Sequence, residues 1–153
     1  SVLPLLDAEL VICGPRGTRT MAAEDLMISS FTTNLARDEL IQAVRVAKLS
    51  RAARWGFFKF NQKAGEFAHA IGAVVVDRDR DIFRAVIGAI ETAPIVVEDA
   101  AALFDGASKA ASGPAIDAAA VAELLDQHGV TDPYLRKLAV VALQRAMLEA
   151  CAP

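Results

Sequence analysis

The side chains whose chemistry suits catalysis or metal binding do not cluster in this sequence. Cys13 and Cys151 stand near opposite ends of the 153 residues without C-x-x-C spacing, and His69 and His128 lie near neither cysteine. A metal or iron–sulfur site needs several ligands close together, and a nucleophile needs a neighbouring base. We therefore expect no catalytic residue, no metal site and two reduced thiols. His69 lies in an apolar run, where we expect it to be packed or hydrogen-bonded.

The sequence also lacks a recognisable phosphate-binding loop. Its nine glycines are scattered, and no G-x-G-x-x-G pattern occurs. Lys59 lies within the aromatic run at residues 55–61, where a lysine commonly packs its aliphatic stem and extends its ammonium to solvent. A net charge of −3 and a pI near 5.4 argue against nucleic acid as a ligand, since such binding requires a basic face.

Composition indicates a small domain, or one domain with a fragment of another, that shares part of its surface with a partner. The chain is 54% hydrophobic with a mean hydropathy of +0.36, although small proteins must cover much surface. We expect a neighbouring subunit or a second copy to bury part of it. No apolar run reaches the roughly 18 residues of a membrane span, and residues 1–6 do not resemble a signal peptide. These features favour a cytoplasmic protein, and Ser1 suggests a truncated start.

Three β-rich runs in succession, at residues 55–61, 69–76 and 82–90, organise the second part of the chain. The charged segment at residues 77–81 between the last two runs indicates a hairpin. The sequence therefore predicts an α+β fold with a three-stranded antiparallel sheet. The strands alternate little between polar and apolar residues, so both faces of the sheet require cover. Helices can cover one face, and we expect something else to cover part of the other.

The remaining segments predict strands before this sheet and about three helices after it. We expect strands at residues 10–13, 18–21 and 39–46, helical turns at 22–28 and a loop at 31–35. Leu40, Val44 and Val46 should share one strand face, with Ile41 on the other. Helices are expected at 98–105, from Pro114 to about residue 127, and from the Asp132–Pro133 start signal to about residue 150. The basic segment at residues 48–54 is either a solvated linker or a surface for an acidic partner.

Short motifs in this order resemble one protein family. They are Phe58-Lys59-Phe60, Lys63-Ala64-Gly65-Glu66-Phe67-Ala68, Gly72-Ala73-Val74, Gly88-Ala89-Ile90 with Pro94, and Tyr134, Leu138-Ala139 and Arg145-Ala146. They are similar to the K-x-x-x-R-x-G-D-x-A, G-V-A, G-G-V-x-x-x-P and Y-x-x-x-L-A…R-A patterns of the FAD-binding medium subunit of molybdenum hydroxylases. This is the carbon monoxide dehydrogenase and xanthine dehydrogenase family. The resemblance implies two parts: residues 1–49 as the closing strands of a truncated FAD-binding domain, and residues 50–153 as the domain that follows it.

The resemblance also implies candidate flavin contacts. Ile41 matches an apolar residue that packs near the isoalloxazine, Lys59 matches a lysine at the polar edge of the ring, and Glu66 stands where the family often has Asp. Glu66 is either a cofactor-binding residue or a structural residue that ties the Gly65 turn to the sheet. The family's glycine-rich flavin loops are not in this chain, so we expect FAD in the intact subunit and none retained by this chain alone.

Two functions remain open at this point. By resemblance, the chain is part of an electron-transfer subunit that completes the flavin pocket and docks on a molybdenum-binding large subunit and an iron–sulfur small subunit. The complex would be an oxidoreductase, and the chain alone would be inactive. The alternative is a non-catalytic assembly module with no redox role. The sequence names neither the substrate, which the large subunit would recognise, nor the electron acceptor.

Overall fold

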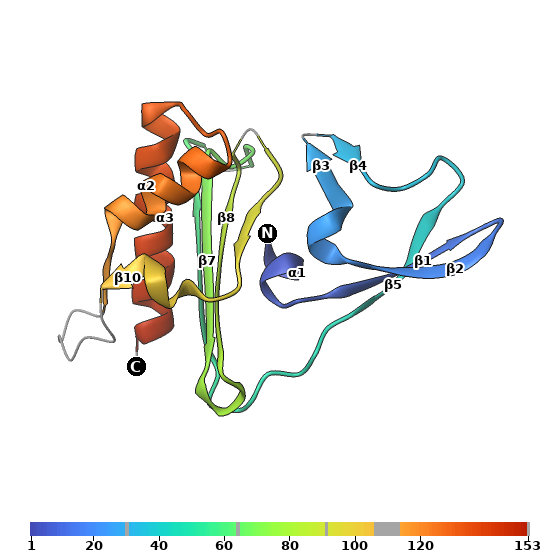
Figure 1. Ribbon diagram of the computed structural model, residues 1–153, viewed down its shortest axis with the longest axis horizontal. Coiled ribbons are helices and arrows are strands. Elements are labelled where there is room, and N and C mark those ends of the chain that lie inside the picture. Colours follow the sequence, from blue (N-terminus) through green and yellow to red (C-terminus); the bar gives the residue numbers. More distant parts are fainter. Residues whose placement is uncertain (30, 64, 91, 106–113, 153) are drawn as a thin grey trace.

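A four-stranded antiparallel sheet forms the centre of the computed structural model, which describes residues 1–29, 31–63, 65–90, 92–105 and 114–152 (Figure 1). Its strands lie in the order β6 (Arg54–Phe60), β7 (Ala70–Asp77), β8 (Ile82–Gly88) and β9 (Ile95–Val97). The α+β fold and the three long antiparallel strands are confirmed. The prediction missed β9, a three-residue strand that follows Pro94 directly and gives too little periodicity to detect.

The β7–β8 hairpin turns through a short 3-10 segment, η2 (Arg78–Arg80), and Asp81 closes it with a left-handed φ of 54°. Asp77, at the end of β7, is fully buried. Its Oδ2 accepts the backbone N–H of Ser50 at 2.7 Å, and Arg80 Nε lies 3.9 Å away. The Ser50 hydrogen bond lowers the pKa of Asp77 from its ordinary value, although burial opposes that shift. In its charged carboxylate form, Asp77 therefore holds the segment around Ser50, which precedes β6, against the sheet.

The long C-terminal helix α3 (Pro133–Cys151) covers one face of the sheet (Figure 1). The Asp132 carboxylate accepts the N–H groups of Tyr134 at 2.7 Å and Leu135 at 3.2 Å, so the predicted helix start is confirmed. The helix packs directly over two glycines of the strands, Gly56 and Gly72. The core on this face includes Val74, Ala85, Ile87, Val121, Leu125, Leu143 and Ala146.

The helix expected from Pro114 begins later than predicted. Ala115–Ile116 form a short strand, β11, which pairs with β10 (Phe104–Asp105), and α2 (Ala118–Gln127) follows. The Asp117 carboxylate accepts two backbone N–H groups in the first turn of α2, so this residue caps the helix in preference to Pro114. The expected helix at 98–105 is reduced to a 3-10 turn, η3 (Ala100–Leu103), followed by β10.

The N-terminal helix α1 (Val2–Leu5) lies against the opposite face of the sheet. Leu5 packs there with Ala73, Val75 and Val86, and Leu49 from the linker joins the cluster. Asp7, just after α1, pairs with Arg84 of β8 at 3.3 Å. Part of the second face is thus covered by the N-terminal segment of the same chain, which the sequence did not predict.

A second, three-stranded antiparallel sheet stands beside the first (Figure 1). It has the order β2 (Gly17–Ala22), β1 (Glu9–Gly14) and β5 (Leu40–Arg45), which confirms the predicted strands. The helical turns expected at 22–28 are only a 3-10 turn, η1 (Ala23–Leu26), and the segment then enters β3 (Met27–Ser29). The expected loop at 31–35 contains β4 (Thr32–Thr33), which pairs with β3. The domain boundary at residue 49 stays a prediction.

Among the described helices, none is long and apolar enough to cross a membrane.

Candidate functional site

Lys59 lies on β6, an edge strand of the four-stranded sheet, where it pairs with Ile71 of β7. Its side chain is exposed, and Nζ donates a hydrogen bond to the backbone oxygen of Glu66 at 3.2 Å. An ammonium has three donors, so this bond leaves it able to donate to a further acceptor. The contact holds the charge of Lys59 beside the loop that joins β6 to β7.

Glu66 closes that loop. Its Oε2 accepts the N–H of Lys63 at 3.2 Å, and its own N–H donates to the Lys63 oxygen at 3.3 Å. Gly65 sits inside this turn with a φ of 89°, which an L residue rarely adopts. This geometry favours a structural role for the Glu66 carboxylate, which holds the turn around Gly65. The backbone oxygen of Glu66 orients Lys59. A direct contact between Glu66 and a cofactor stays a prediction.

Ile41 lies in the other sheet, on β5, whose six residues are all exposed. Ile41 pairs with Ile12 and Val44 pairs with Leu10, because the ladder shifts by one residue between Val11 and Ile12. Directly paired residues share a face, so this bulge puts Ile41 and Val44 on the same face. The predicted separation of those two side chains is therefore wrong. Lys59 and Glu66 meet in one loop, and Ile41 stands apart from them in the second sheet.

Glu39 fixes the chain just before Ile41. Its two carboxylate oxygens accept hydrogen bonds from Arg19 Nε and Nη2 of β2, both at 2.8 Å, and Oε2 also accepts the N–H of Ala36 at 2.9 Å. These bonds, that from Arg19 first, lower the pKa of Glu39 from 4.5 to about 2. The pair therefore anchors the start of β5 to β2 at neutral pH.

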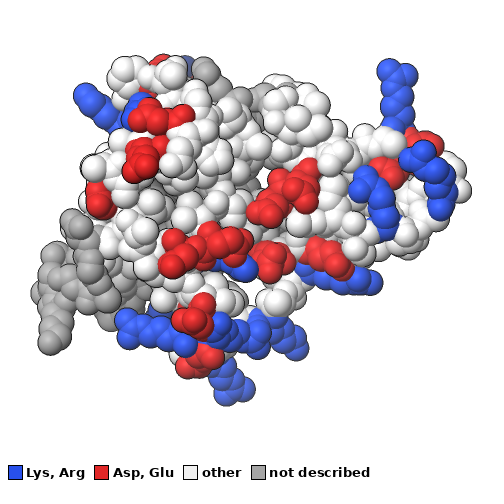
Figure 2. Space-filling model, viewed as in Figure 1, with Lys and Arg blue, Asp and Glu red and all other residues white. Residues whose placement is uncertain are grey.

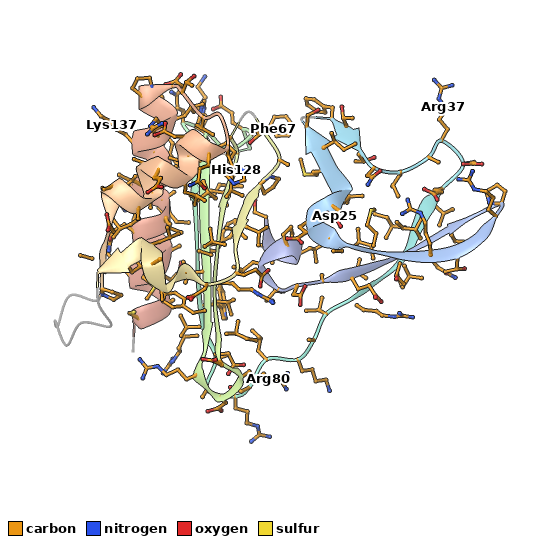
Figure 3. The ribbon with its side chains drawn as sticks, viewed as in Figure 1. Asp25, Arg37, Phe67, Arg80, His128 and Lys137 are labelled. Carbon is orange, nitrogen blue, oxygen red and sulfur yellow. The ribbon has the colours of Figure 1, made fainter. Side chains whose placement is uncertain are left out.

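Phe31 and Phe67 bring the loops of the two sheets together, a contact that the sequence did not predict. Their rings meet edge to face with centroids 6.5 Å apart, although the residues are 96% and 87% exposed. Phe31 has a left-handed φ of 60°, an unfavourable conformation for an aromatic residue. Phe67 follows Glu66 directly, and Figure 3 shows it between the two sheets. The sequence predicted only a loop at residues 31–35, with no signal for a contact between Phe31 and Phe67.

Charge is unevenly distributed over the molecule. Figure 2 shows basic side chains gathered at the lower end, with acidic ones among them, where the β7–β8 hairpin meets the linker after β5. Among the described residues, no group of three or more His, Cys, Asp or Glu side chains could hold a metal ion. Cys13 is half-buried, Cys151 is exposed, and both are free thiols. The ring of His69 lies beside Phe60, with centroids 6.3 Å apart.

The fold is that of about half of the carbon monoxide dehydrogenase chains that it matches. It superimposes on carbon monoxide dehydrogenase from Hydrogenophaga pseudoflava with a TM-score of 0.77 at 22% identity, covering 97% of this chain and 54% of that one. Reconstituted CO dehydrogenase from Oligotropha carboxidovorans gives a TM-score of 0.71 at 26% identity, with the same coverage. No family model matches the chain.

Two curated relatives are medium subunits of multi-subunit enzymes. The chain is 30% identical to the nicotine 6-hydroxylase medium subunit of Paenarthrobacter nicotinovorans, over 97% of this chain and 54% of the relative. It is also 30% identical to the carbon monoxide dehydrogenase medium chain of Afipia carboxidovorans, over 96% of this chain and 53% of the relative. The chain is thus a homologue of the medium subunits of carbon monoxide dehydrogenase and nicotine 6-hydroxylase, and it spans about half their length.

Proposed function

We propose that this chain is part of the flavin-carrying medium subunit of a cytoplasmic molybdenum hydroxylase and completes the pocket around the flavin ring. The homology to two medium subunits carries the proposal. In the assembled enzyme, a large molybdenum-binding subunit would oxidise the substrate, and an iron–sulfur subunit would pass electrons to FAD. The chain alone would have no activity, because the substrate site would lie in the large subunit.

Lys59 is the residue of this chain with the clearest role toward FAD. FAD, when bound, would supply the electron-accepting ring, and a fixed ammonium at the edge of that ring would favour negative charge there. Lys59 suits this role because it is exposed and held at 3.2 Å by the Glu66 backbone oxygen. Ile41 would pack near the ring from the other sheet, and Glu39 would hold the start of its strand. Glu66 would act mainly by shaping the loop.

Lys59 and Ile41 would contact the ring end of FAD, and the chain offers no matching set of donors for its pyrophosphate. Phosphate groups in such sites are held by several backbone N–H donors of glycine-rich loops, and the nine glycines of this chain form no such pattern. A single exposed charge contact contributes about 0–1 kcal/mol, and one buried aliphatic side chain about 1.5–3 kcal/mol. These contributions do not offset the roughly 4–15 kcal/mol cost of immobilising a ligand. The chain alone should therefore not retain FAD.

Substitution of Lys59 in a subunit of the relatives' full length tests the proposed role. Lys59→Ala should make the flavin reduction potential more negative by about 30 mV, which for a two-electron couple corresponds to about 1.4 kcal/mol. FAD content should change little, because the pyrophosphate contacts remain. Lys63→Ala is the matched control, since Lys63 is an exposed lysine four residues later, in the loop that follows β6. Equal potentials in Lys59→Ala and the unmodified subunit would refute the role of Lys59.

Besides a role at the flavin, the exposed apolar side chains support a second role for this chain, in contact with neighbouring protein surface. Leu40, Ile41 and Val44 lie exposed on β5, the edge strand of its sheet, and Trp55 lies exposed on β6. Edge strands with apolar side chains are usually covered in the assembled protein. We propose that neighbouring protein surface covers them, from the rest of the subunit, another subunit or a second copy. The same feature favours the alternative of a non-catalytic assembly module, which normal FAD content in the full-length subunit would exclude.

A further inference from the structure

An apolar stripe runs along the outer face of α3. Tyr134, Val141 and Leu148 recur at seven-residue spacing, which is two helical turns, and they are 52%, 48% and 41% exposed. The helix already buries its other face against the sheet, through Ala139, Ala142, Leu143 and Ala146 among others. Seven-residue spacing of apolar side chains is the pattern that packs against another helix.

A groove of about 620 Å³ lies beside this stripe. Phe58 of β6, Ile116 of β11 and Val140 line it, together with polar residues of α3. Two of those polar side chains are already engaged. Gln144 accepts the N–H of Ile116 at 2.7 Å and donates to the Pro114 oxygen at 3.2 Å, and Glu149 accepts the N–H of Phe57 at 2.9 Å. The groove thus offers mainly apolar surface to a ligand.

Two cations border the stripe. The Arg145 guanidinium lies over the Phe58 ring, 5.1 Å from its centroid, and Lys137 extends away from the fold (Figure 3). Neither forms a salt bridge with another described residue. By contrast, Arg136 on the adjacent side of the helix pairs with Asp126. An apolar stripe flanked by unpaired cations is complementary to apolar side chains interspersed with carboxylates.

The geometry favours a helix over a strand as the occupant. A strand would add to the edge of β6, but Glu149 already occupies the outward N–H of Phe57 there. A second copy is disfavoured as well. Antiparallel packing of two α3 helices about a two-fold axis at Val141 would bring Lys137 of one copy to Arg145 of the other, because both lie four residues from the axis. Like charges at that position would repel.

We infer that the outer face of α3 is a docking surface for an amphipathic acidic helix of another subunit in the same enzyme. The inference rests on the proposed function, which supplies the multi-subunit complex. Apolar side chains of the partner helix would cover Val141 and Leu148 and enter the groove. Its Asp or Glu residues would reach Lys137 and Arg145. Charge complementarity would set the orientation of the two helices, and the apolar contact would supply most of the affinity.

Site-specific photocrosslinking in the complete complex tests this contact. A benzophenone amino acid at Val141 of the full-length subunit, co-expressed with its partner subunits, should crosslink to another subunit. The crosslinked peptide should be helical and carry Asp or Glu within one turn. The same probe at Asp25, on the other part of the molecule, should not yield that peptide. Crosslinking to a second copy, to the rest of the same subunit, or to no protein would overturn the inference.

Charge reversal provides a second measurement. Lys137→Glu should raise the dissociation constant between the purified subunits by about tenfold, and high salt should reduce that difference. Arg37→Glu, an exposed arginine far from α3, is the control and should leave the constant unchanged (Figure 3). Lys137→Glu with unaltered affinity would contradict the inference. Flavin content separates the two proposals: a subunit with normal FAD but no Val141 crosslink refutes only the docking surface.

Discussion

Gly72 is the position where the packing of α3 on the sheet is most directly testable. A Cβ atom added to Gly72 would lie 2.4 Å from the carbonyl carbon and oxygen of Ala142 and 2.5 Å from the N of Leu143. All three are backbone atoms of α3, which cannot rotate away as a side-chain end can. Gly72→Ala must therefore displace the helix from β7.

The magnitude follows from two opposing effects. Overpacking a well-packed core costs about 1–3 kcal/mol, and replacing a strand glycine recovers about 0.5–1 kcal/mol through the unfolded state. Contacts of 2.4 Å with backbone atoms put the cost in the upper half of its range, at about 2–3 kcal/mol, so the net loss in unfolding free energy should be about 1–2 kcal/mol. For a chain of this size, each kcal/mol lowers Tm by roughly 2–4 °C. We expect Gly72→Ala to lower Tm by about 2–8 °C.

Thermal unfolding followed by circular dichroism measures this shift. Gly14→Ala, in β1, is the matched control, because its Cβ would come no closer than 3.1 Å to Glu39 Cγ and 3.4 Å to the backbone oxygen of Asp38. Ala142→Gly should fail to rescue Gly72→Ala, since the clash is with the backbone of residue 142. A Tm for Gly72→Ala equal to that of Gly14→Ala would refute the close packing of helix and strand.

Ala89 has a left-handed φ of 58°, so Ala89→Gly should raise the unfolding free energy by about 0.5–1 kcal/mol in denaturant titrations; a destabilised variant would refute the strain. The pKa of Glu39 is lowered from 4.5 to about 2, so its stabilising effect is complete above about pH 4.5 and is lost as pH falls toward 2. The Tm difference between wild type and Glu39→Gln should therefore shrink over that range, and a constant difference would contradict the account. Asp77→Ala removes the acceptor for the Ser50 N–H and should accelerate trypsin cleavage in the linker; unchanged cleavage would contradict the role of Asp77.

Local patterns were sufficient to predict the main strands and the start of α3. The apolar runs around Val74 and Val86 and the Asp132 cap act through neighbouring residues, which a sequence displays directly. The errors in the predicted elements have two causes: competition between neighbouring residues, and pairing between strands. Asp117 offered a better helix cap than Pro114, and β9 exists because Ile95 can pair with Ile87 of β8.

In the candidate site too, the sequence predicted what neighbouring residues determine and not what tertiary contacts determine. The sequence singled out Lys59 and Glu66 because they are close together and belong to one motif. The structure joins them by a hydrogen bond, and their role toward a cofactor stays a prediction. The Phe31–Phe67 contact was not predictable, since two loops far apart in the chain meet only after both sheets have formed. Likewise, the bulge that puts Ile41 beside Val44 has no sequence signal in β5 itself, because it arises from the pairing with β1.

The central claim is that this chain supplies the ring side of a flavin pocket whose pyrophosphate contacts lie in the other half of the subunit. Its most direct test is the FAD released on denaturation, measured by absorbance, from the 153-residue chain and from a subunit of the relatives' full length. We expect a colourless short chain and close to one FAD per full-length subunit. Near-stoichiometric FAD in the short chain, or none in the full-length subunit, would contradict the claim.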